Sequence, residues 1–560
     1  MVSAALCLGI GQVQAAVYSV TEVASPDKYE QHYAMGLNES GQMVGVARGG
    51  YNFQFLMEDY ITEENSYFRS TCFISDEEVS TGELDISSQD CLKTQLSRYT
   101  NISRNITSNH FGNFPNYQKI GDIVSFVFDN NEVEFFNLVD VHNDTLNGLT
   151  RSTVEELNAI NDSGVSVGTV TAPYSSFLFQ QTGDDASESP ILLFSREYEK
   201  RAVVVKNGET TQLTPEFSDY GGKSFATDIT NSGFVAGAES ITIHSSTQTD
   251  IDSCDTAIVP ENVCAWQLFQ TRSAFPLRAV VWQLDENNQV VDKVQYPLSF
   301  TPSDSQNSIY STFALAVNEN NVAVGYGDVP ITSSETSVTN RYPMIFENGV
   351  SREILADHDT YPGGIALDIN NNNLVTGTLN TFFDNTHNEE FFVYNMESGS
   401  LERPTTFYST AASSGNAVND SGIVVGEAEY EVTTSNIRRK HGFVYDTNTG
   451  QFNDLNDLIE CTSVYEIVST QDINNNGQIA ATAFKTVDSR NARGEVILDS
   501  EGEPETQQVL VGVILDVIPG GEKDDCSSTA EPDYERKGFS SGILTSLLLG
   551  TLVAIRRRFI

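Results

Sequence analysis

The sequence predicts an all-β repeat protein, and among such folds a seven-bladed β-propeller with loop insertions and a C-terminal hydrophobic helix. The first observation is a phrase of the form Ala-x-x-Ile/Val-Asn-x-x-Gly-x-Val-Val-Gly, which recurs seven times with local variation. The second is an apolar strand, a polar Asn/Gly turn and another strand, which follow most copies. Two hairpins make a four-stranded unit that must stack on its neighbours to bury both faces. An extended β-solenoid and two smaller β domains are the alternative architectures.

Each copy of the first phrase predicts a β-hairpin. β-branched runs flank the Asn-x-x-Gly segment, where Asn bonds its own backbone and Gly takes a positive φ at low cost. Successive copies from Asn318 onward are 52, 49 and 55 residues apart, which suits one four-stranded blade per interval. The motif positions are Asn38, Asn161, Thr230 or Asn231, Asn318, Asn370, Asn419 and Asn474.

The second phrase supplies the other half of each unit, so the repeat domain is expected over residues 17–518. An early strand, from Val17, is expected to pair with the last blade and fasten the ring, because a closed ring protects most strand edges. Residues 511–521 take the place of the second phrase in the seventh unit. The other copies begin at Ser125, Arg201, Arg278, Tyr342, Glu390 and His441.

Two stretches, at about 50–120 and 240–275, interrupt the repeat and are predicted to be insertions. Each contains two cysteines, and a further two lie near the end of the repeat domain. An even number of cysteines without a Cys-x-x-Cys pair favours disulfides in an exported chain. Proximity favours one set of partners, while other pairings of the six remain open. The favoured pairs are Cys72–Cys91, Cys254–Cys264 and Cys461–Cys526.

The beginning of the chain is predicted to be a signal peptide. Residues 1–16 are largely apolar and end in small residues. Val13 and Ala15 suit the −3 and −1 positions of a signal peptidase site. An ordinary buried strand is the alternative interpretation.

The end of the chain is predicted to be a polar linker, at 519–537, and a hydrophobic helix with a basic tail, at 538–560. The apolar run from Ile543 to Ile555 has 13 residues, fewer than the roughly 20 of a full membrane span. Three arginines follow this run, and the positive-inside rule keeps them in the cytoplasm and the rest of the chain outside. They are Arg556, Arg557 and Arg558.

This tail resembles the GlyGly-CTERM sorting signals of exported bacterial proteins. Those signals combine a small-residue motif, a short hydrophobic helix and a terminal basic cluster, and here Ser541 and Gly542 stand at the small-residue motif. The resemblance implies a periplasm-facing, membrane-anchored precursor that a rhomboid-type sortase cleaves after export. The product is then released or attached to the cell surface. A single-pass membrane anchor is the alternative.

The repeats resemble the HAF-type extracellular repeats of exported bacterial proteins, in which an Asn-x-x-Gly hairpin leads to a His-Ala-Phe-x-Trp-like strand. The closest matches to that strand are His-Gly-Phe-Val-Tyr at 441–445 and Arg-Ala-Val-Val-Trp at 278–282. Together with its two ends, the chain is identified as a member of an uncharacterised exported bacterial family, a domain of unknown function. The resemblance implies export and repeat architecture, and it supplies no catalytic residues.

Charge limits the partners that the protein is expected to have. The chain has 77 Asp and Glu residues against 31 Lys and Arg residues, a formal net charge of −46. Such a surface repels nucleic acid and anionic membrane faces, so no nucleic-acid partner is predicted. It suits a protein in cation-rich surroundings.

One weak metal candidate is present. Asp472, Asn474 and Asn476 place oxygen atoms at the first, third and fifth positions of a calcium loop. The ninth and twelfth positions of that loop hold Ala480 and Ala483, which have no side-chain oxygen. A plain hairpin turn requires the same residue types, so a turn without bound calcium is the alternative. No other cofactor is predicted.

The sequence contains no GxSxG elbow, phosphate-binding loop, dinucleotide fingerprint or HExxH motif, so no catalytic residue is predicted. The favoured function is an exported, surface-attached or secreted binding scaffold for a protein or glycan, with insertions lining the recognition site. The alternative is a secreted hydrolase or lyase that acts on polysaccharide with carboxylates at the channel mouth. Carboxylates or histidines converging at the channel would favour the enzyme.

Overall fold

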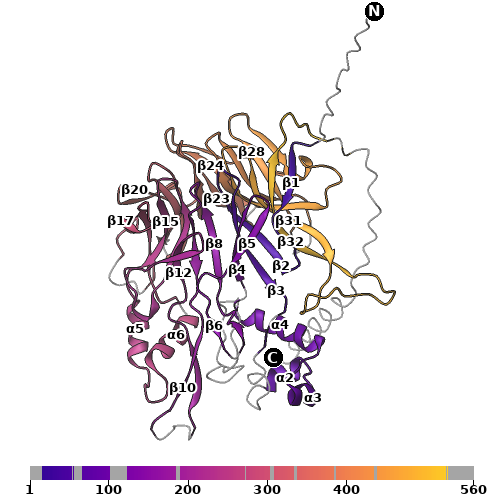
Figure 1. Ribbon diagram of the computed structural model, residues 1–560. Coiled ribbons are helices and arrows are strands. Elements are labelled where there is room, and N and C mark those ends of the chain that lie inside the picture. The colour runs from indigo at the N-terminus through magenta and orange to yellow at the C-terminus, as the bar shows by residue number, and fades with distance from the viewer. Residues whose placement is uncertain are drawn as a thin grey trace, which may run out of the picture.

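The fold is a seven-bladed β-propeller, as the repeats predict (Figure 1). The computed structural model contains seven four-stranded antiparallel sheets, and the innermost strand of each contacts the innermost strands of its two neighbours. The structure describes residues 16–526 apart from gaps at 53, 56–65, 101–120, 122, 145, 184–188, 272, 303–307, 333–336, 384–385, 434–437 and 525.

In blades 1 to 6 the chain runs from the innermost strand outward. Blade 1 contains β2 (Tyr29–Leu37), β3 (Met43–Gly50), β4 (Ile123–Asp129) and β5 (Glu132–Phe136). Blade 2 contains β8 (Glu155–Ile160), β9 (Ser166–Val170), β12 (Arg201–Lys206) and β13 (Glu209–Leu213). Blade 3 contains β14 (Ser224–Ile229), β15 (Phe234–Ser240), β16 (Leu277–Leu284) and β17 (Val290–Gln295).

The second half of the ring follows the same order. Blade 4 contains β18 (Thr312–Val317), β19 (Ala323–Thr332), β20 (Ser337–Glu347) and β21 (Val350–Glu353). Blade 5 contains β22 (Gly363–Ile369), β23 (Leu374–Phe383), β24 (Thr386–Asn395) and β25 (Ser400–Glu402). Blade 6 contains β26 (Ser413–Val418), β27 (Ile423–Glu429), β28 (Lys440–Asp446) and β29 (Gln451–Asp454).

Blade 7 is made from both ends of the repeat domain. It contains β30 (Tyr465–Ile473), β31 (Ile479–Asp488), β32 (Thr506–Val517) and, as its outermost strand, β1 (Tyr18–Glu22). β1 pairs antiparallel with β32, so the predicted closure of the ring by the early strand is confirmed. The Glu22 carboxylate accepts from the Tyr465 hydroxyl at 2.7 Å and pairs with the Lys485 ammonium at 2.6 Å.

A β-bulge in the innermost strands explains the glycine that ends the motif. In blade 2 the register of β8 against β9 shifts between Leu157 and Ala159. A Cβ on Gly168 would lie 1.9 Å from the Glu156 carbonyl oxygen, much too close for any side chain. The equivalent distances in blades 1 to 6 are 1.9–2.3 Å. Blade 7 has Ala481 at this position, and β30 carries two register shifts instead of one.

The hydrophobic cores lie between neighbouring blades. In β12, Val203 and Val205 pack in the core shared with blade 1, whereas Ala202 and Val204 pack in the core shared with blade 3. Because successive strand residues point to opposite faces, each blade contributes to two cores. No blade therefore buries its apolar side chains without its neighbours, as expected of a repeat protein.

Insertions interrupt several blades between the second and third strands. The segment between β3 and β4 contains α2 (Ser66–Thr71), α3 (Asp76–Thr81) and α4 (Ile86–Thr100), with the Cys72–Cys91 disulfide. The segment between β15 and β16 contains α5 (Ser245–Asp252) and α6 (Glu261–Thr271), with the Cys254–Cys264 disulfide. The third disulfide joins Cys461 to Cys526, and all three pairs are those that proximity favours.

Blade 2 contains a third insertion, at 171–200, which the sequence did not predict. It forms the hairpin of β10 (Ser175–Phe179) and β11 (Ile191–Ser195), and Leu193 of this hairpin packs with Val259 and Val263 near α6. Asn161 and Thr230 are only 69 residues apart, so the spacing hid the hairpin. The connections between blades also contain β6 (His142–Asn143), β7 (Gly148–Leu149), η2 (Asp219–Gly221) and η3 (Leu455–Asp457).

The antiparallel order gives the propeller two different ends. The turns after the innermost strands lie at one end, which we call the turn face. The insertions and the connections between blades lie at the opposite end, the insertion face, and in Figure 1 α2 to α6, β6 and β10 gather there at the bottom.

No helix in the described part of the chain is both long and apolar enough to cross a membrane. The predicted signal peptide, apart from Ala16, and the predicted tail with Ser541, Gly542 and its three arginines lie outside the described residues. Both remain predictions.

Candidate functional site at the channel mouth

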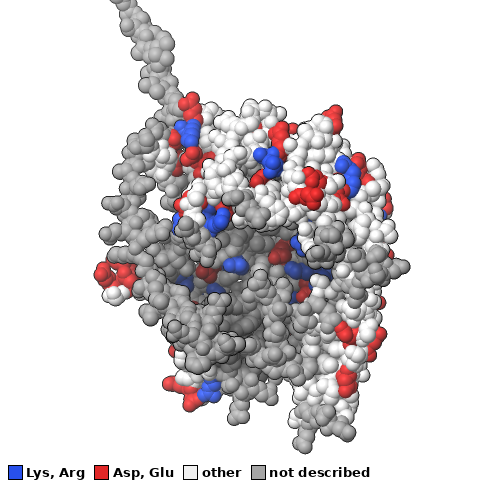
Figure 2. Space-filling model, turned by 180° about the vertical axis from the view of Figure 1, so that it is seen from behind, with Lys and Arg blue, Asp and Glu red and all other residues white. Residues whose placement is uncertain are grey.

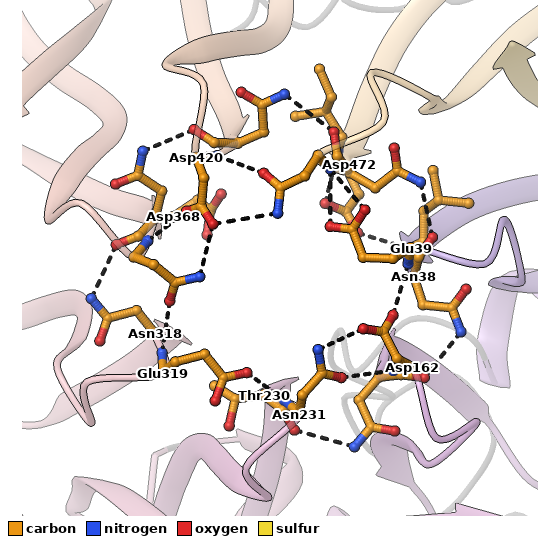
Figure 3. A pocket seen from close by; sticks show the side chains of 18 of the residues that line it. Asn38, Glu39, Asp162, Thr230, Asn231, Asn318, Glu319, Asp368, Asp420 and Asp472 are labelled. Atoms are coloured by element: carbon orange, nitrogen blue, oxygen red, sulfur yellow. Dashed lines mark hydrogen bonds between the residues drawn. The ribbon is translucent and has the colours of Figure 1, made fainter.

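Turns from all seven blades surround the mouth of the channel on the turn face (Figure 3). They enclose a cavity of about 180 Å³, lined by the motif asparagines and the residues on either side of them. Asn38, Asn318 and Asp420 belong to a circle of side chains in which neighbours are hydrogen bonded.

Each motif asparagine performs two tasks. In blade 6, Oδ1 of Asn419 accepts the backbone N–H groups of Ser421 and Ile423 at 3.1 and 3.0 Å, which shapes the turn. Its Nδ2 donates to the main-chain carbonyl of Asn474 in blade 7 at 3.2 Å. An aspartate would shape the turn equally well but has no N–H to donate. The bond to the next blade therefore accounts for asparagine.

Six of these amide bonds link successive blades. They are buried, with N···O distances of 2.8–3.2 Å. The pairs are Asn38–Asn161, Asn161–Thr230, Asn318–Asn370, Asn370–Asn419, Asn419–Asn474 and Asn474–Asn38.

Thr230 occupies the asparagine position of blade 3 and interrupts this first ring. Its Oγ1 accepts the Phe234 N–H at 3.0 Å, so the turn keeps its shape. Within the described residues, however, no hydrogen bond joins its hydroxyl to Asn318. Blades 3 and 4 are joined there instead by Thr227, whose hydroxyl donates to the Ala314 carbonyl at 3.0 Å.

A second ring lies one residue further along each turn, and it closes completely. The Asp420 N–H donates to Oδ1 of Asn475 at 2.8 Å, and Oδ1 of Asp420 accepts the Asn371 N–H at 2.9 Å. The same relation continues around the channel at 2.7–3.0 Å. Its members are Glu39, Asp162, Asn231, Glu319, Asn371, Asp420 and Asn475.

Three aspartates two residues before the motif position bind the following blade from inside the channel. The Oδ2 atoms of Asp228, Asp368 and Asp472 accept the N–H groups of Val317, Val418 and Leu37 at 2.7–2.8 Å. Each Oδ1 atom accepts the N–H of the residue that follows its own aspartate. All three carboxylates therefore hold backbone groups on two blades.

These three carboxyl groups are weaker acids than usual. Desolvation raises the pKa of Asp368 to about 8, and Asp228 and Asp472 add repulsion. Desolvation also raises the pKa values of Asp228 and Asp472 to about 6, while the N–H bonds lower them in part. Near neutral pH the inner channel thus holds a proton more readily than the surface carboxylates do.

The polar side chains at the channel mouth are largely occupied by hydrogen bonds to the protein's own backbone. Carboxylates do converge there, as the hydrolase hypothesis requires, but the ring carboxylates and the three inner aspartates all accept backbone N–H groups. No histidine is among the described residues that line the cavity. Across the described ranges, no group of three His, Cys, Asp or Glu side chains is arranged to hold a metal ion.

The weak calcium candidate lies within these rings. Asp472 accepts from Leu37, Asn474 donates to the Asn38 carbonyl, and Asn476 donates to the Glu39 carbonyl at 2.9 Å. The three side chains thus join blade 7 to blade 1. Calcium binding at these residues stays a prediction.

The second repeated phrase also has a structural role. Its first residue reaches the connection that leads to the next blade: Arg201 donates to the Gly221 carbonyl at 2.7 Å, and Arg278 to the Tyr310 carbonyl at 2.9 Å. Nδ1 of His441 lies 2.7 Å from Asp454. Burial opposes the charged imidazole, but Asp454 and Glu466 raise the pKa of His441 to about 9.

Sequence reasoning missed the bonds between blades, although a signal was present. Asp-Ile precedes the motif position in the third, fifth and seventh copies, at Asp228, Asp368 and Asp472. This alternation has no use inside a single hairpin and would have indicated a contact between blades.

Comparisons with known proteins leave the function of this chain open. A family model described as a protein of unknown function (DUF3466) matches residues 1–558. No curated protein matches the chain.

Several solved structures are similar at low identity. The β-propeller domain of the Trilobed protease from Pyrococcus furiosus is 9% identical, with 91% of this chain and 99% of that one covered and a TM-score of 0.31. An acylaminoacyl peptidase from Pyrococcus horikoshii is 11% identical over 63% of this chain and 50% of that one, with a TM-score of 0.30. A puromycin hydrolase is 12% identical over 66% and 48%, with a TM-score of 0.32. At these identities and TM-scores, the similarities say nothing about the activity of this chain.

Proposed function

Because the chain belongs to the DUF3466 family, whose function is unknown, we propose its function from its own structure: an exported, non-enzymatic binding scaffold that recognises its partner with the insertion face. In this proposal the protein is either attached to the cell surface through its tail or secreted. The partner is a protein or a glycan outside the cell.

The proposal rests on one observation: the two ends of the ring differ in what their side chains are used for. On the turn face, the repeated side chains hold backbone groups of their own and neighbouring blades, which leaves few free for a ligand. On the insertion face, each blade carries a different segment, and variable segments on a rigid scaffold are where recognition commonly resides. The differences between blades therefore mark the recognition surface.

The insertions are braced in a way that suits recognition. The Ala492 N–H donates to the Asp90 carboxylate of α4, and Nη2 of Arg493 donates to the Leu84 carbonyl at 3.0 Å. The hairpin β10–β11 is tied to the segment before α6, since Nε2 of Gln181 donates to the Ile258 carbonyl at 3.0 Å. Rigid insertions lose little entropy on binding.

Exposed apolar side chains also favour the insertion face as the binding surface. Phe382 and Phe383 near the tip of the β23–β24 hairpin are 59% and 53% exposed, and Leu178 of β10 is 71% exposed. Val432, in the corresponding loop of blade 6, is 82% exposed. Adjacent exposed apolar side chains, such as Phe382 and Phe383, are typical of an interaction surface.

The alternative function, a polysaccharide hydrolase or lyase, has one favourable observation: the raised pKa of Asp368, to about 8, suits a general acid. Against it, Asp368 accepts N–H groups from Ile369 and Val418, at 2.7 Å each. A catalytic acid needs at least one oxygen free to reach the substrate.

The test is a binding screen of the purified full-length protein against glycan arrays and cell surfaces, followed by matched variants. The double substitution Phe382→Ser and Phe383→Ser alters the insertion face of blade 5. Glu397→Ala alters an exposed residue in a turn at the opposite end of the same blade. We expect a ligand whose binding is reduced by the first variant and not by the second. Equal binding by both variants, or turnover of a polysaccharide by the wild type, would contradict the proposal.

A further inference from the structure

Positive charge is distributed unequally along the channel axis. The seven turns after the innermost strands, at 38–42, 161–165, 230–233, 318–322, 370–373, 419–422 and 474–478, contain no Lys or Arg. In Figure 2, Lys and Arg side chains are visible together with Asp and Glu in the recessed centre of the side seen from behind, while Asp and Glu are the more frequent at its outer edges. Basic residues in or beside the second and third strands, toward the insertion face, include Arg48, Lys200, Arg278, Arg341, Lys440 and Lys485. Lys200, Lys440 and Lys485 form ion pairs with Glu156, Glu427 and Glu22, whereas no ion pair joins Arg48 or Arg341 to a described residue.

Blades 3 and 4 add an aromatic wall at this end of the channel. Phe225 and Phe313 come from the innermost strands β14 and β18, and their ring centroids are 5.2 Å apart. The Tyr326 ring stacks on Phe313 with a centroid distance of 5.6 Å and an interplanar angle of 15°. The Arg341 guanidinium lies 4.7 Å from the Tyr326 centroid, and Arg341 is an exposed residue. The Tyr326 ring and the Arg341 guanidinium are thus presented together, while Phe313, which is only 9% exposed, supports the Tyr326 ring from below.

Other blades repeat this combination. In blade 1 the Arg48 guanidinium lies 5.6 Å from the centroid of Tyr33, which belongs to the innermost strand β2. In the blade 2 insertion the Arg196 guanidinium lies 4.0 Å from the centroid of Tyr174. The ring of Trp266, on α6, lies 5.8 Å from that of Tyr174.

Two hydrogen-bond donors in this last cluster have no acceptor among the described residues. They are Nε of Arg196 and Nε1 of Trp266, both buried. Arg201, which is 4% exposed, likewise has Nε and Nη1 without an acceptor in the described part of the chain. Buried donors normally find acceptors, and those of a guanidinium favour an anionic one. These donors are therefore available for an anionic acceptor from outside the described residues.

We propose that the insertion-face end of the channel binds an acidic glycan, with sugar rings packed on the aromatic wall and carboxylate groups paired with Arg341 and Arg48. This inference rests on the proposed binding function and names its ligand class. Arginine and a carboxylate form paired N–H···O bonds, and apolar sugar faces pack on aromatic rings.

The chain's charge separates this ligand from nucleic acid. The net charge of −46 repels any polyanion, but double-stranded DNA, with a charge about every 1.7 Å along its axis, is repelled more strongly than a glycan with one carboxylate per sugar. Asp328 lies beside the proposed site, where its Oδ2 accepts the Ser311 N–H at 2.8 Å. It also adds negative charge there, which disfavours a dense polyanion more than a glycan with spaced carboxylates.

The experiment is isothermal titration of the purified full-length protein with oligomers of galacturonic acid. Maltose oligomers of the same length serve as the neutral control. We expect the wild type to bind the acidic oligomer and not the neutral one. We expect Arg341→Ala to weaken binding at least about tenfold, the usual effect of losing a hydrogen bond between charged groups.

The matched control is Arg352→Ala, which removes an exposed arginine from the outer strand of the same blade. It should change the affinity less than about twofold, and both variants should unfold at the wild-type temperature. Equal losses in the two variants would overturn the inference, as would no binding by the wild type. Equal or tighter binding of single-stranded DNA that also depends on Arg341 would overturn it in favour of nucleic acid.

Failure of this inference differs from failure of the proposed function. If the acidic oligomer does not bind but another ligand is lost on Phe382→Ser and Phe383→Ser, the scaffold function stands and the glycan inference falls. If no ligand depends on the insertion face, both fall. Polymeric and oligomeric galacturonate compared in the same titration separate a cell-surface polysaccharide from a soluble fragment as the source.

Discussion

The side-chain amide of Asn474 donates a hydrogen bond of 3.0 Å to the main-chain carbonyl of Asn38, 436 residues earlier in the chain. This bond joins the last blade to the first at the channel mouth. Beside it, the Leu37 N–H donates to Asp472 at 2.7 Å, and the Asn475 N–H donates to Glu39 at 3.0 Å. Three parallel interactions therefore cross the seam where the ring closes.

Replacing Asn474 with Asp is expected to destabilise the seam. The carboxylate still accepts the N–H groups that shape the turn, but it has no donor for the buried Asn38 carbonyl and repels it. Losing one buried hydrogen bond costs about 1–3 kcal/mol of unfolding free energy. Chemical denaturation measures the loss, and Ser398→Ala, in an exposed turn of blade 5, is the control.

Replacing Thr230 with Asn is expected to stabilise the protein. The new amide restores the missing bond of the first ring by donating to the Asn318 carbonyl, as Asn318 itself does to Asn370. The expected gain is about 1 kcal/mol in the free energy of unfolding. An unchanged or lower stability would mean that the contact of Thr227 with Ala314 already fills this role.

Stability is expected to fall as pH rises through the range set by the inner aspartates. The pKa values of Asp228 and Asp472 are about 6 and that of Asp368 about 8 in the folded protein, above the unfolded value near 3.8. The stabilisation is fully present below pH 3.8 and is lost progressively up to about pH 8, because the unfolded chain ionises first. Thermal melts across this range measure the slope.

The matching variant for this pH dependence is Asp368→Asn. It cannot ionise, so its melting temperature should fall less steeply with pH than that of the wild type. Equal slopes for the two proteins would show that another group governs the dependence. The variant also loses one hydrogen-bond acceptor, which lowers its stability at every pH, so the slopes are compared and not the absolute melting temperatures.

Removing residues 17–24, and with them β1, is expected to expose the edge of β32. Unpaired edges pair with other chains, so the truncated protein should form oligomers that size-exclusion chromatography detects. A synthetic peptide of residues 17–24 added in excess should restore the monomer, and a scrambled peptide should not. A monomeric truncated protein would show that the edge is covered by another segment.

Replacing Gly237 with Ala is expected to destabilise blade 3 severely. The new Cβ would lie 1.9 Å from the Phe225 carbonyl, and the backbone of the bulge must move to admit it. A loss of at least about 3 kcal/mol or failure to fold is expected, as for other overpacked sites. Gly148→Ala, where a Cβ meets nothing closer than 3.7 Å, should leave the melting temperature unchanged.

The repeats predicted the seven blades, because each blade depends on local turn chemistry and spacing. The need to protect strand edges predicted the closing strand, and proximity in the sequence predicted the disulfide partners. The hydrogen bonds between blades were not predicted. The acceptor of each motif amide, such as the Asn38 carbonyl, is a main-chain atom that leaves no mark in the sequence. The third insertion was hidden because its interval of 69 residues is much closer to the 49–55 residues of a plain blade than the first interval, of 123 residues, is.

The candidate site was predicted only in part. The sequence placed function in the insertions at 50–120 and 240–275, and their described parts lie on the face opposite the repeated turns. It did not predict that Arg341 would lie over Tyr326, because two strand positions come together there only after the blades have stacked. Pairs of this kind need the three-dimensional register of β19 and β20.

The pairing of β1 with β32 also sets the order of folding events. Ser19 and Asp516 lie side by side in the ladder although 497 residues separate them, so this contact has a sequence separation close to the length of the domain. Contacts of such separation form late and slowly, because the entropy of closing the loop is lost before the ladder gains anything. The docking of the first strand is therefore expected to be the last step in folding, after blades 1 to 6 have formed.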